Sequence, residues 1–425
     1  MKLLLKNGRV VDPAHKIDTI LDILIEEGKI AERRAKIPSK GIDTLDLKGL
    51  VITPGFIDMH AHLREPGRED EETIETGTKA AAAGGFTGVA CMPNTDPVND
   101  DQAVTEYILS RAKKSAAVNV YPVGCVTKGR KGEELAQIGD LVESGVVAVS
   151  DDGSSVASGL MMRKALEYTK MFGIPVIEHC EDPALSDGGV MNEGYYSTIL
   201  GLRGMSSVTE DVIAMRDILL AKMTNGRLHI AHVSTKGCVS MIRDAKKQKI
   251  NVTCEATPHH FTLTDAAVVG YDTNMKMNPP LRTKEDRRAI IAGLKDGTID
   301  ALATDHAPHN IIEKNVEFNL APFGIIGFET AVSLALHTLV NTKIISVSRL
   351  VELMSLNPAK ILNLKKGTLS RGADADITVL DMQKKITIDA SKFRSKSRNT
   401  PFNGWKLKGA PVMTIVSGNI VHDSR

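Results

Sequence analysis

The feature that most constrains this chain is a pair of histidines, two residues apart, at the end of an apolar run. The run reads Gly55-Phe56-Ile57-Asp58-Met59-His60-Ala61-His62. Side chains two apart on a β-strand point to the same face, so His60 and His62 should project together from the end of this strand. Two imidazoles on one face form half of a metal site, and the pattern therefore predicts a metal centre at the end of a buried strand.

The central part of the chain repeats an order of strand followed by helix. Eight apolar runs are predicted as strands, at residues 55–60, 85–92, 118–126, 146–150, 175–179, 228–233, 251–257 and 301–304. Helical patterns lie between them, for example at residues 72–83, 102–114, 161–171, 208–223 and 284–295. The strand runs are apolar on both faces, as in parallel strands covered by helices. Eight such units predict the α/β fold class and a closed, TIM-like (β/α)8 barrel.

A doubly wound open sheet is the alternative fold. In that fold the ligand site gathers at one switch point of the strand order. Here polar residues follow nearly every predicted strand, which a closed barrel explains better.

The two ends of the chain have a different pattern of predicted secondary structure from its centre. Short strand-like runs and turns fill residues 1–52 and 365–425, and neither segment alone can bury much surface. We expect the two segments to form one composite β-sandwich beside a catalytic barrel of residues 53–364. An insertion at residues 181–207 interrupts the barrel pattern; it is interpreted as a lid or substrate wall, with a plain surface excursion as the alternative.

Residues that can bind metal recur after the predicted strands. Strand ends in a barrel of this kind meet at one face, so these side chains should converge. A lone buried histidine is usually a hydrogen-bonded core residue, and His229, which lies earlier in its strand, is interpreted in that way. Six positions from five strand ends are harder to explain as independent core residues. The candidate ligands are His60, His62, Asp152, His179, His232 and Asp305.

The ligand set also indicates the type of metal. Imidazoles and carboxylates without thiolates suit Zn²⁺, with Mn²⁺ or Co²⁺ as substitutes. Six ligands exceed the needs of one catalytic zinc, whereas two ions about 3.5 to 4 Å apart, bridged by a carboxylate and a water, would use all of them. We expect one or two Zn²⁺ ions per subunit. Spacing alone does not separate Asp152 from its neighbour Asp151 as the bridge.

Composition excludes several classes of partner. The formal net charge is +1, so no basic surplus indicates binding to nucleic acid or to an anionic membrane. Five scattered cysteines without C-x-x-C spacing favour reduced thiols and a cytoplasmic protein. The first residues are too soon polar for a signal peptide, and no apolar run reaches the roughly 18 to 20 residues of a spanning helix.

Several longer motifs resemble those of the dihydroorotases in the amidohydrolase superfamily. The segment Pro54 to Gly67 is similar to their opening metal motif, and Ala303 to His309 is similar to a second signature. The H-x-H pair marks only the superfamily, whereas Leu63-Arg64-Glu65-Pro66-Gly67 together with Asn278-Pro279-Pro280-Leu281-Arg282 is more specific. Further matching segments are Met92-Pro93-Asn94-Thr95, Thr257-Pro258-His259-His260 and Ala321-Pro322-Phe323-Gly324.

The residues after the fourth predicted strand separate subgroups of this superfamily. Many relatives, including hydantoinases and allantoinases, place a carboxylated lysine there to bridge the metals. This chain has Val149-Ser150-Asp151-Asp152-Gly153 without a lysine, which is similar to the class I bacterial dihydroorotases. The resemblance favours Asp152 over Asp151 as the bridge.

The resemblance implies the reversible cyclisation of N-carbamoyl-L-aspartate to L-dihydroorotate, in de novo pyrimidine biosynthesis, by metal-activated water or hydroxide. It implies that Asp305 is the catalytic proton carrier. Arg64 would bind the substrate carboxylate, although a surface ion pair with Glu65 or Glu69 is its alternative reading. Asn94 could instead be an ordinary turn residue. The residues implied in substrate binding are His62, Arg64, Asn94, Asn278, His309, Phe323 and Gly324.

Two rival functions stay open at the level of sequence. One is another cyclic amidohydrolase, namely a hydantoinase, dihydropyrimidinase or allantoinase. The other is a non-catalytic dihydroorotase-like partner of aspartate carbamoyltransferase, which should have lost metal ligands that are present here. The resemblance also implies aspartate carbamoyltransferase as a partner of an active enzyme, and we expect a homo-oligomer.

Overall fold

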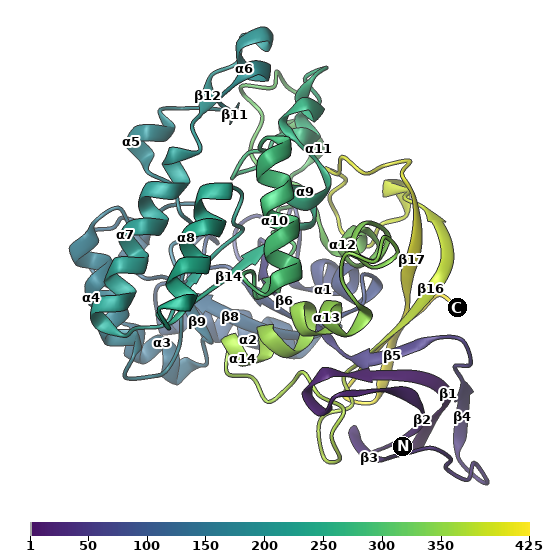
Figure 1. The fold of residues 1–425 in the computed structure, drawn as a ribbon. Helices are drawn as coiled ribbons and strands as arrows, with labels where there is room; N and C mark the ends of the chain where they lie inside the picture. Colours follow the sequence, from purple (N-terminus) through teal and green to yellow (C-terminus); the bar gives the residue numbers. More distant parts are fainter. Residues whose placement is uncertain (1) are drawn as a thin grey trace.

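The computed structural model describes residues 2–425 and contains a barrel of eight parallel strands (Figure 1). Their hydrogen-bonded order is β15-β14-β13-β10-β9-β8-β7-β6. All eight predicted strands are present, with slightly shorter bounds. They are β6 (Phe56–Ala61), β7 (Phe86–Cys91), β8 (Asn119–Gly124), β9 (Ala148–Ser150), β10 (Val176–Glu178), β13 (Leu228–Ile230), β14 (Val252–Ala256) and β15 (Ala301–Leu302).

The first and last strands meet just beyond the end of β15. The amide of Asp305 donates to the carbonyl of His60 at 3.0 Å, and the amide of His62 donates to the carbonyl of His306 at 2.9 Å. The buried carboxylate of Asp58 accepts from the amide of Thr304 at 3.1 Å and from its hydroxyl at 2.5 Å. These bonds close the sheet, which confirms the barrel and excludes the open-sheet alternative.

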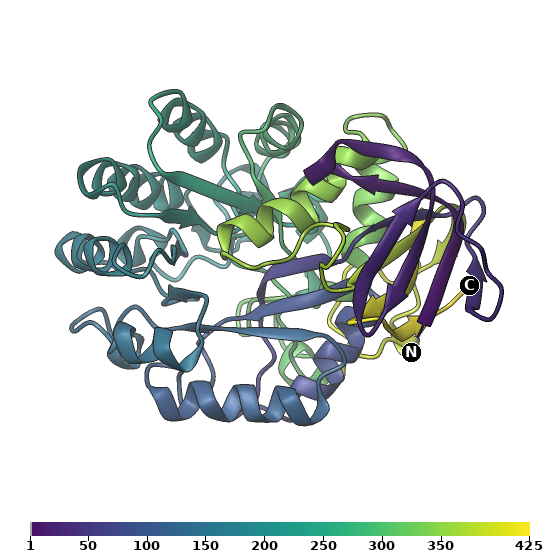
Figure 2. The same cartoon turned by 90° about the horizontal axis from the view of Figure 1, so that it is seen from below.

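One helix follows each barrel strand and covers its outer face (Figures 1 and 2). The helices are α1 (Ile74–Ala83), α2 (Gln102–Ser115), α3 (Ile138–Ser144), α4 (Gly159–Thr169), α7 (Val208–Thr224), α8 (Lys236–Lys247), α10 (Lys284–Asp296) and α12 (Phe328–Ala335). Polar side chains set several of their starts: Thr73, Asp101 and Thr235 each accept a hydrogen bond from a first-turn amide. The five helices proposed from the sequence are all present.

Shorter helices continue the chain after the barrel and within its loops. The π-helical segments η5 and η6 extend α12 and α13, respectively. The bounds are α9 (Pro258–Thr262), α11 (Ile311–Lys314), η5 (Leu336–Val340), α13 (Val347–Val351), η6 (Glu352–Leu356) and α14 (Asn357–Ile361).

Strands from the two ends of the chain pair in one mixed sheet, as Figure 2 shows beside the barrel. Its strands are β1 (Lys2–Asp12), β2 (Ile17–Glu26), β3 (Lys29–Arg34), β4 (Asp43–Asp46), β5 (Val51–Pro54), β16 (Ile377–Thr387), β17 (Lys406–Val416) and β18 (Asn419–Asp423). Strand β5 joins the two halves, since it runs parallel to β1 and antiparallel to β16.

The two halves of this sheet share one apolar core. Leu5, Ile25 and Ile52 from the first half pack with Ile377 and Ile415 from the second. The pairing of the two ends is therefore confirmed, whereas the domain boundaries at residues 52 and 365 stay a prediction.

The insertion at residues 181–207 forms a small layer above the barrel (Figure 1). Arg282 anchors it by donating to the side chain of Asn192 at 3.1 Å and to the carbonyl of Met205 at 2.9 Å. The lid role stays a prediction. The layer contains α5 (Pro183–Ser186), β11 (Met191–Asn192), α6 (Tyr195–Leu200) and β12 (Gly204–Met205).

Within residues 2–425, we find no helix with both the length and the apolar character needed to cross a membrane.

We predict that Thr304→Val destabilises the barrel closure. The change removes the hydroxyl donor to Asp58 and the acceptor for the amide of His306, which lies 2.9 Å from that hydroxyl. Leaving these buried groups unpaired should lower the free energy of unfolding by about 1–3 kcal/mol. Chemical denaturation measures the effect, with the exposed Thr19→Val on β2 as the matched control. Equal stability of the two variants would show that this contact is not needed for closure.

Candidate functional site

The structure places all six candidate metal ligands at the end of the barrel where the strands terminate. His60 lies on β6, and the others follow β6, β9, β10, β13 and β15 within three residues. All six side chains are buried or nearly so. A cavity of about 240 Å³ opens onto this cluster. Its lining includes His62, Asp152, His179, His232 and Asp305.

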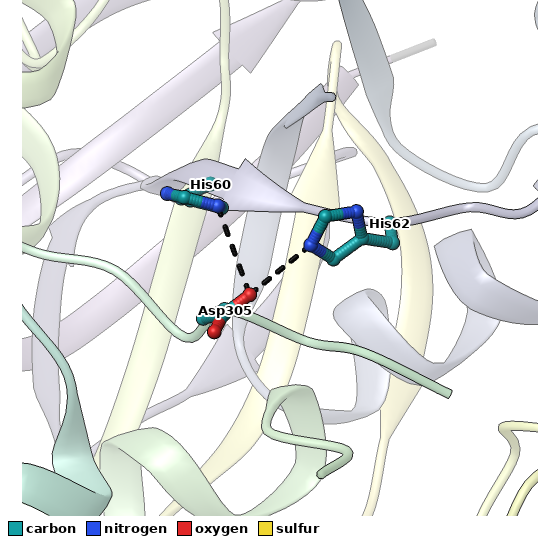
Figure 3. A group of neighbouring side chains, drawn as sticks. All are labelled: His60, His62 and Asp305. Atoms are coloured by element: carbon teal, nitrogen blue, oxygen red, sulfur yellow. Dashed lines mark hydrogen bonds and ion pairs between the residues drawn. The ribbon is translucent and has the colours of Figure 1, made fainter. Parts of the chain in front are cut away.

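Two carboxylates connect the imidazoles. The Nε2 atom of His60 lies 3.1 Å from Asp152 Oδ1 and 3.7 Å from Asp305 Oδ1. The Nε2 atom of His62 lies 3.1 Å from Asp305 Oδ1 and 3.6 Å from Asp152 Oδ2. Figure 3 shows His60 and His62 converging on Asp305 from one strand. Residues from opposite ends of the barrel sequence thus share one small volume.

The other two histidines also lie near Asp152. Oδ1 of Asp152 lies 3.8 Å from His232 Nε2 and 4.0 Å from His179 Nδ1. The same two ring nitrogens lie 2.9 Å from each other. Asp152 therefore faces all four histidines, which is the position that a bridging carboxylate requires.

Asp151 does not share this role in the structure. Its Oδ1 accepts from the amides of Val126 and Thr127, at 2.9 and 3.1 Å, and its other oxygen accepts from the Thr127 hydroxyl. Both oxygens of Asp151 thus hold the loop after β8. This geometry supports Asp152 as the bridging ligand, a choice that spacing in the sequence left open.

Three of the four histidines have a hydrogen-bond partner on the ring nitrogen that faces away from the cluster, and this partner orients the ring. Glu255 Oε1 accepts from His60 Nδ1 at 2.7 Å, and Asn94 Oδ1 lies 2.8 Å from His62 Nδ1. Glu181 Oε2 lies 2.9 Å from His179 Nε2. A donor hydrogen on the outer nitrogen leaves the inner nitrogen with its lone pair, which is the form that binds metal.

Electrostatics keep the carboxylates of the cluster ionised. Burial alone would raise the pKa of Asp152, but His60 and the other imidazoles lower it well below its usual range. Burial is likewise outweighed at Asp305, where His62 and His60 lower the pKa. The pKa of Glu255 falls to about 2, since His229 and His60 donate to it against the effect of burial.

The residues fit a divalent cation. Among residues 2–425, no hydrogen-bond partner serves the buried His60 Nε2 or the buried His232 Nδ1. Buried polar atoms are nearly always paired, so an unpaired His60 Nε2 that faces the ionised Asp152 at 3.1 Å indicates a position suited to a cation. Two overlapping groups have ligand spacing: His60, His62 and Asp305 form one, and His60, Asp152 and His232 form the other.

Three residues of the site adopt a strained backbone. Arg64, His232 and Asp305 have φ values of 59°, 29° and 48°, in the left-handed region that side chains other than glycine rarely adopt. Such strain costs about 1–3 kcal/mol per residue and concentrates at functional positions. The surrounding contacts therefore hold these three side chains in orientations that the local chain alone would not favour.

The residues implied in substrate binding border the same cavity. Its lining includes His62, Arg64, Asn94, Asn278, His309, Phe323 and Gly324. Arg64 is half-buried, with 13% of its side chain exposed, and its ion pair is with Glu71 at 3.0 Å. The alternative pairing of Arg64 with Glu65 or Glu69 is absent from the described residues, because Glu65 binds Arg111 at 2.6 Å.

The backbone at Gly324 already has internal partners. Its amide donates to the carbonyl of Lys276 at 3.0 Å, and its carbonyl accepts from Lys314 and Asn399 at 3.0 and 3.1 Å. A Cβ atom at this position, where φ is 121°, would lie 2.7 Å from Ala307 Cβ. Glycine is thus required for the close approach of this loop to the cavity.

Sequence reasoning missed the supporting residues. Glu255 carried a signal, since it is a carboxylate inside the buried strand β14. Glu71 carried none, because it stands in a charged run that reads as a solvated surface. Lys314 is also buried and donates to the carbonyls of Pro322 and Gly324, and burial lowers its pKa to about 7.

Comparisons with known proteins agree with the geometry. The family described as Dihydro-orotase-like matches residues 49–238, and the one described as Amidohydrolase family matches residues 265–422. The dihydroorotase of Geobacter metallireducens is 56% identical over 424 residues, which cover 99% of this chain and 100% of that protein. The dihydroorotase of Acetivibrio thermocellus is 53% identical over 419 residues, covering 99% and 98%.

A solved structure shows the same fold at lower identity. The L-hydantoinase (dihydropyrimidinase) from Arthrobacter aurescens matches with a TM-score of 0.90 and 27% identity, covering 99% of this chain and 96% of that chain. The α/β barrel with an added β-rich unit is therefore shared across cyclic amidohydrolases, and the fold alone does not separate their substrates.

We predict that Glu255→Gln weakens metal binding by roughly 10- to 100-fold. The neutral amide of glutamine holds the hydrogen on His60 Nδ1 less firmly than the carboxylate does, so the lone pair of His60 Nε2 is less available to the metal. Metal content after dialysis against a graded chelator series measures the change. The matched control is Glu65→Gln, since Glu65 is equally buried but binds Arg111 and no histidine. Metal retention equal to that of the control would remove Glu255 from this role.

Proposed function

Because the chain belongs to the dihydroorotase family of amidohydrolases, we propose that it interconverts N-carbamoyl-L-aspartate and L-dihydroorotate. The reaction closes or opens a six-membered cyclic ureide by forming or hydrolysing a ring amide. Both molecules carry a carboxylate outside the bond that reacts. The enzyme must therefore bind that carboxylate beside the centre where the amide bond forms or breaks.

One observation carries this proposal: residues suited to bind a carboxylate border the same cavity as the metal-ligand cluster. Arg64, Asn94 and His309 line this cavity together with His62, Asp152 and Asp305. A guanidinium can bind a carboxylate through two parallel hydrogen bonds. Hydantoin offers no such group, which is why this arrangement favours a dihydroorotase over the hydantoinases of the same fold.

We propose that one or two Zn²⁺ ions bind at His60, His62, Asp152, His179, His232 and Asp305, with Asp152 as the bridge. The donor set of imidazole and carboxylate and the unpaired ring nitrogens support this choice. When bound, such ions lower the pKa of water toward neutrality and polarise a carbonyl oxygen. Asp152 occupies the place in which many relatives carry a carboxylated lysine.

Asp305 is the proton carrier in the proposed reaction. In the hydrolytic direction, a water oxygen bonds to the ring carbonyl carbon and the bond from that carbon to nitrogen breaks. The ionised carboxylate of Asp305 takes a proton from the water and passes it to the departing nitrogen. Its low pKa, caused by His62 and His60 against burial, keeps it ready to accept that proton.

Other site residues orient the substrate. Arg64 and His309 hold its carboxylate together with Asn94, while Asn278 and the backbone near Phe323 contact the ring. Asn278 is itself oriented, since it donates to Glu181 at 2.6 Å. Such positioning brings the carbonyl carbon within reach of the water and lowers the entropic part of the barrier.

The cellular assignments are also proposals. Five free cysteines, all buried, are compatible with a cytoplasmic protein, and the near-neutral charge favours small molecules over nucleic acid or membrane as partners. A homo-oligomer, and an association with aspartate carbamoyltransferase, are proposed on the family resemblance.

The purified protein should turn over L-dihydroorotate. It should turn over hydantoin, dihydrouracil and allantoin only weakly if at all. Absorbance assays on the four compounds, with metal content measured on the same sample, test this expectation. Preferred turnover of hydantoin or dihydrouracil would assign the chain to another cyclic amidohydrolase. A metal-loaded protein inactive on all four would favour the non-catalytic alternative.

We expect Asp305→Asn to lower turnover by at least about 100-fold while at least part of the metal remains bound. The amide cannot take the proton, and general acid–base residues contribute about 10²- to 10⁴-fold. Turnover and metal content are measured together. Near-normal turnover would assign the proton transfer to another group. Complete loss of metal would show that Asp305 acts mainly as a metal ligand.

A further inference from the structure

Glu71 lies in none of the motifs that the sequence singled out. Its buried carboxylate nevertheless connects Arg64 and His309, two residues of the proposed carboxylate clamp. The side chain of Glu71 is 1% exposed. Its Oε2 lies 3.0 Å from Arg64 Nε, and its Oε1 lies 2.8 Å from His309 Nδ1. One side chain thus uses a separate oxygen to hold each of the two clamp residues.

The contacts of His309 fix the orientation of its ring. Its Nδ1 lies 2.8 Å from Glu71 Oε1, and its Nε2 lies 2.8 Å from the carbonyl oxygen of Phe323. Arg64 Nη2 lies 3.4 Å from the same Nε2. The ring is therefore held at both nitrogens, and the guanidinium of Arg64 lies beside it.

Two arginines explain why this group is an ion-pair network. Glu71, His309 and Glu313 have the spacing of metal ligands. However, the guanidinium groups of Arg64 and Arg68 each lie 3.0 Å from Glu71, and Arg68 also contacts Glu313. The positive charge that the buried Glu71 requires is therefore supplied by arginine side chains, so the group does not need a metal ion.

The second contact of Arg64 restricts its direction. Its Nε also lies 3.1 Å from the carbonyl of Pro308, so this edge of the guanidinium is occupied by the protein. The backbone of Arg64 is in the left-handed region, which commits the side chain to a strained direction. Glu71 therefore meets a guanidinium with one edge fixed, whose Nη2 lies beside His309, and both Arg64 and His309 line the cavity.

We infer that Glu71 is a positioning residue that holds Arg64 and His309 in place as a preformed clamp for the substrate carboxylate. The inference rests on the proposed function and adds a residue to it. Glu71 itself does not line the cavity, so its action passes through the two clamp side chains. Preorganised donors bind a carboxylate more tightly because their ordering cost is met during folding.

The test compares Glu71→Gln with Glu65→Gln. Both glutamates are buried, both bind an arginine, and they lie six positions apart in the same loop, but the side chain of Glu65 pairs with Arg111 and not with Arg64 or His309. Steady-state assays with L-dihydroorotate give KM and kcat, while metal content and Tm are measured on the same samples. Arg64→Met serves as the reference for loss of the clamp.

Glu71→Gln is expected to raise KM for L-dihydroorotate by about 10- to 100-fold, which is the effect of losing one or two charge-assisted contacts. Its kcat, metal content and Tm should stay near those of Glu65→Gln, whose KM should change less than about twofold. A KM equal to that of the control would overturn the inference. A loss of metal would do so as well, because it would show a general structural role.

A second variant covers the case in which Glu71→Gln does not fold. Glu71→Asp keeps the charge but shortens the side chain, so its carboxylate no longer reaches both Arg64 and His309, and KM should rise by at least about threefold with metal content and Tm unchanged. A KM equal to that of Glu65→Asp would overturn the inference. Failure of the parent to act on L-dihydroorotate would instead contradict the proposed function.

Discussion

The site depends on the closure of the parallel sheet between its first strand and the segment after its last. Two backbone hydrogen bonds and the Asp58–Thr304 contact join them. This seam brings His62 within 3.1 Å of Asp305 although they are 243 residues apart. An open sheet would leave these two residues at opposite edges. The geometry of the metal-ligand cluster is therefore a direct consequence of barrel closure.

The site buries many charged groups, and each of them needs a partner of opposite charge or a hydrogen bond. The ionised Asp152 and Asp305 lie against imidazoles, and the imidazoles lie against Glu255, Glu181 and Asn94. Unpaired buried charges cost folding free energy. The imidazoles lower the cost of burying the two carboxylates, and the outer acceptors lower the cost of burying the imidazoles. In the part of the chain that the structure describes, His60 Nε2 at the centre of the cluster has no hydrogen-bond partner, which is where a bound cation would contribute its charge.

Much of this arrangement could be predicted from the sequence. Apolar runs followed by polar residues identified all eight barrel strands, and the H-x-H pair identified the metal-ligand cluster, because both signals are local. The choice between Asp151 and Asp152 could not be made from their spacing, since it depends on which way the chain turns after β9. Glu71 was missed because its burial is produced by Arg64, Arg68 and His309, which come together only in the folded chain.

The mixed sheet made from both ends of the chain has a consequence for biosynthesis. Strand β5 leads directly into β6, yet its Thr53 hydroxyl donates to the carbonyl of Thr378, 325 residues later. A ribosome adds roughly 5–20 residues per second, so β5 waits on the order of tens of seconds for β16. During that time an apolar edge next to the first barrel strand is open to other nascent chains. Folding chaperones that shield such edges should therefore engage this protein before its translation is complete.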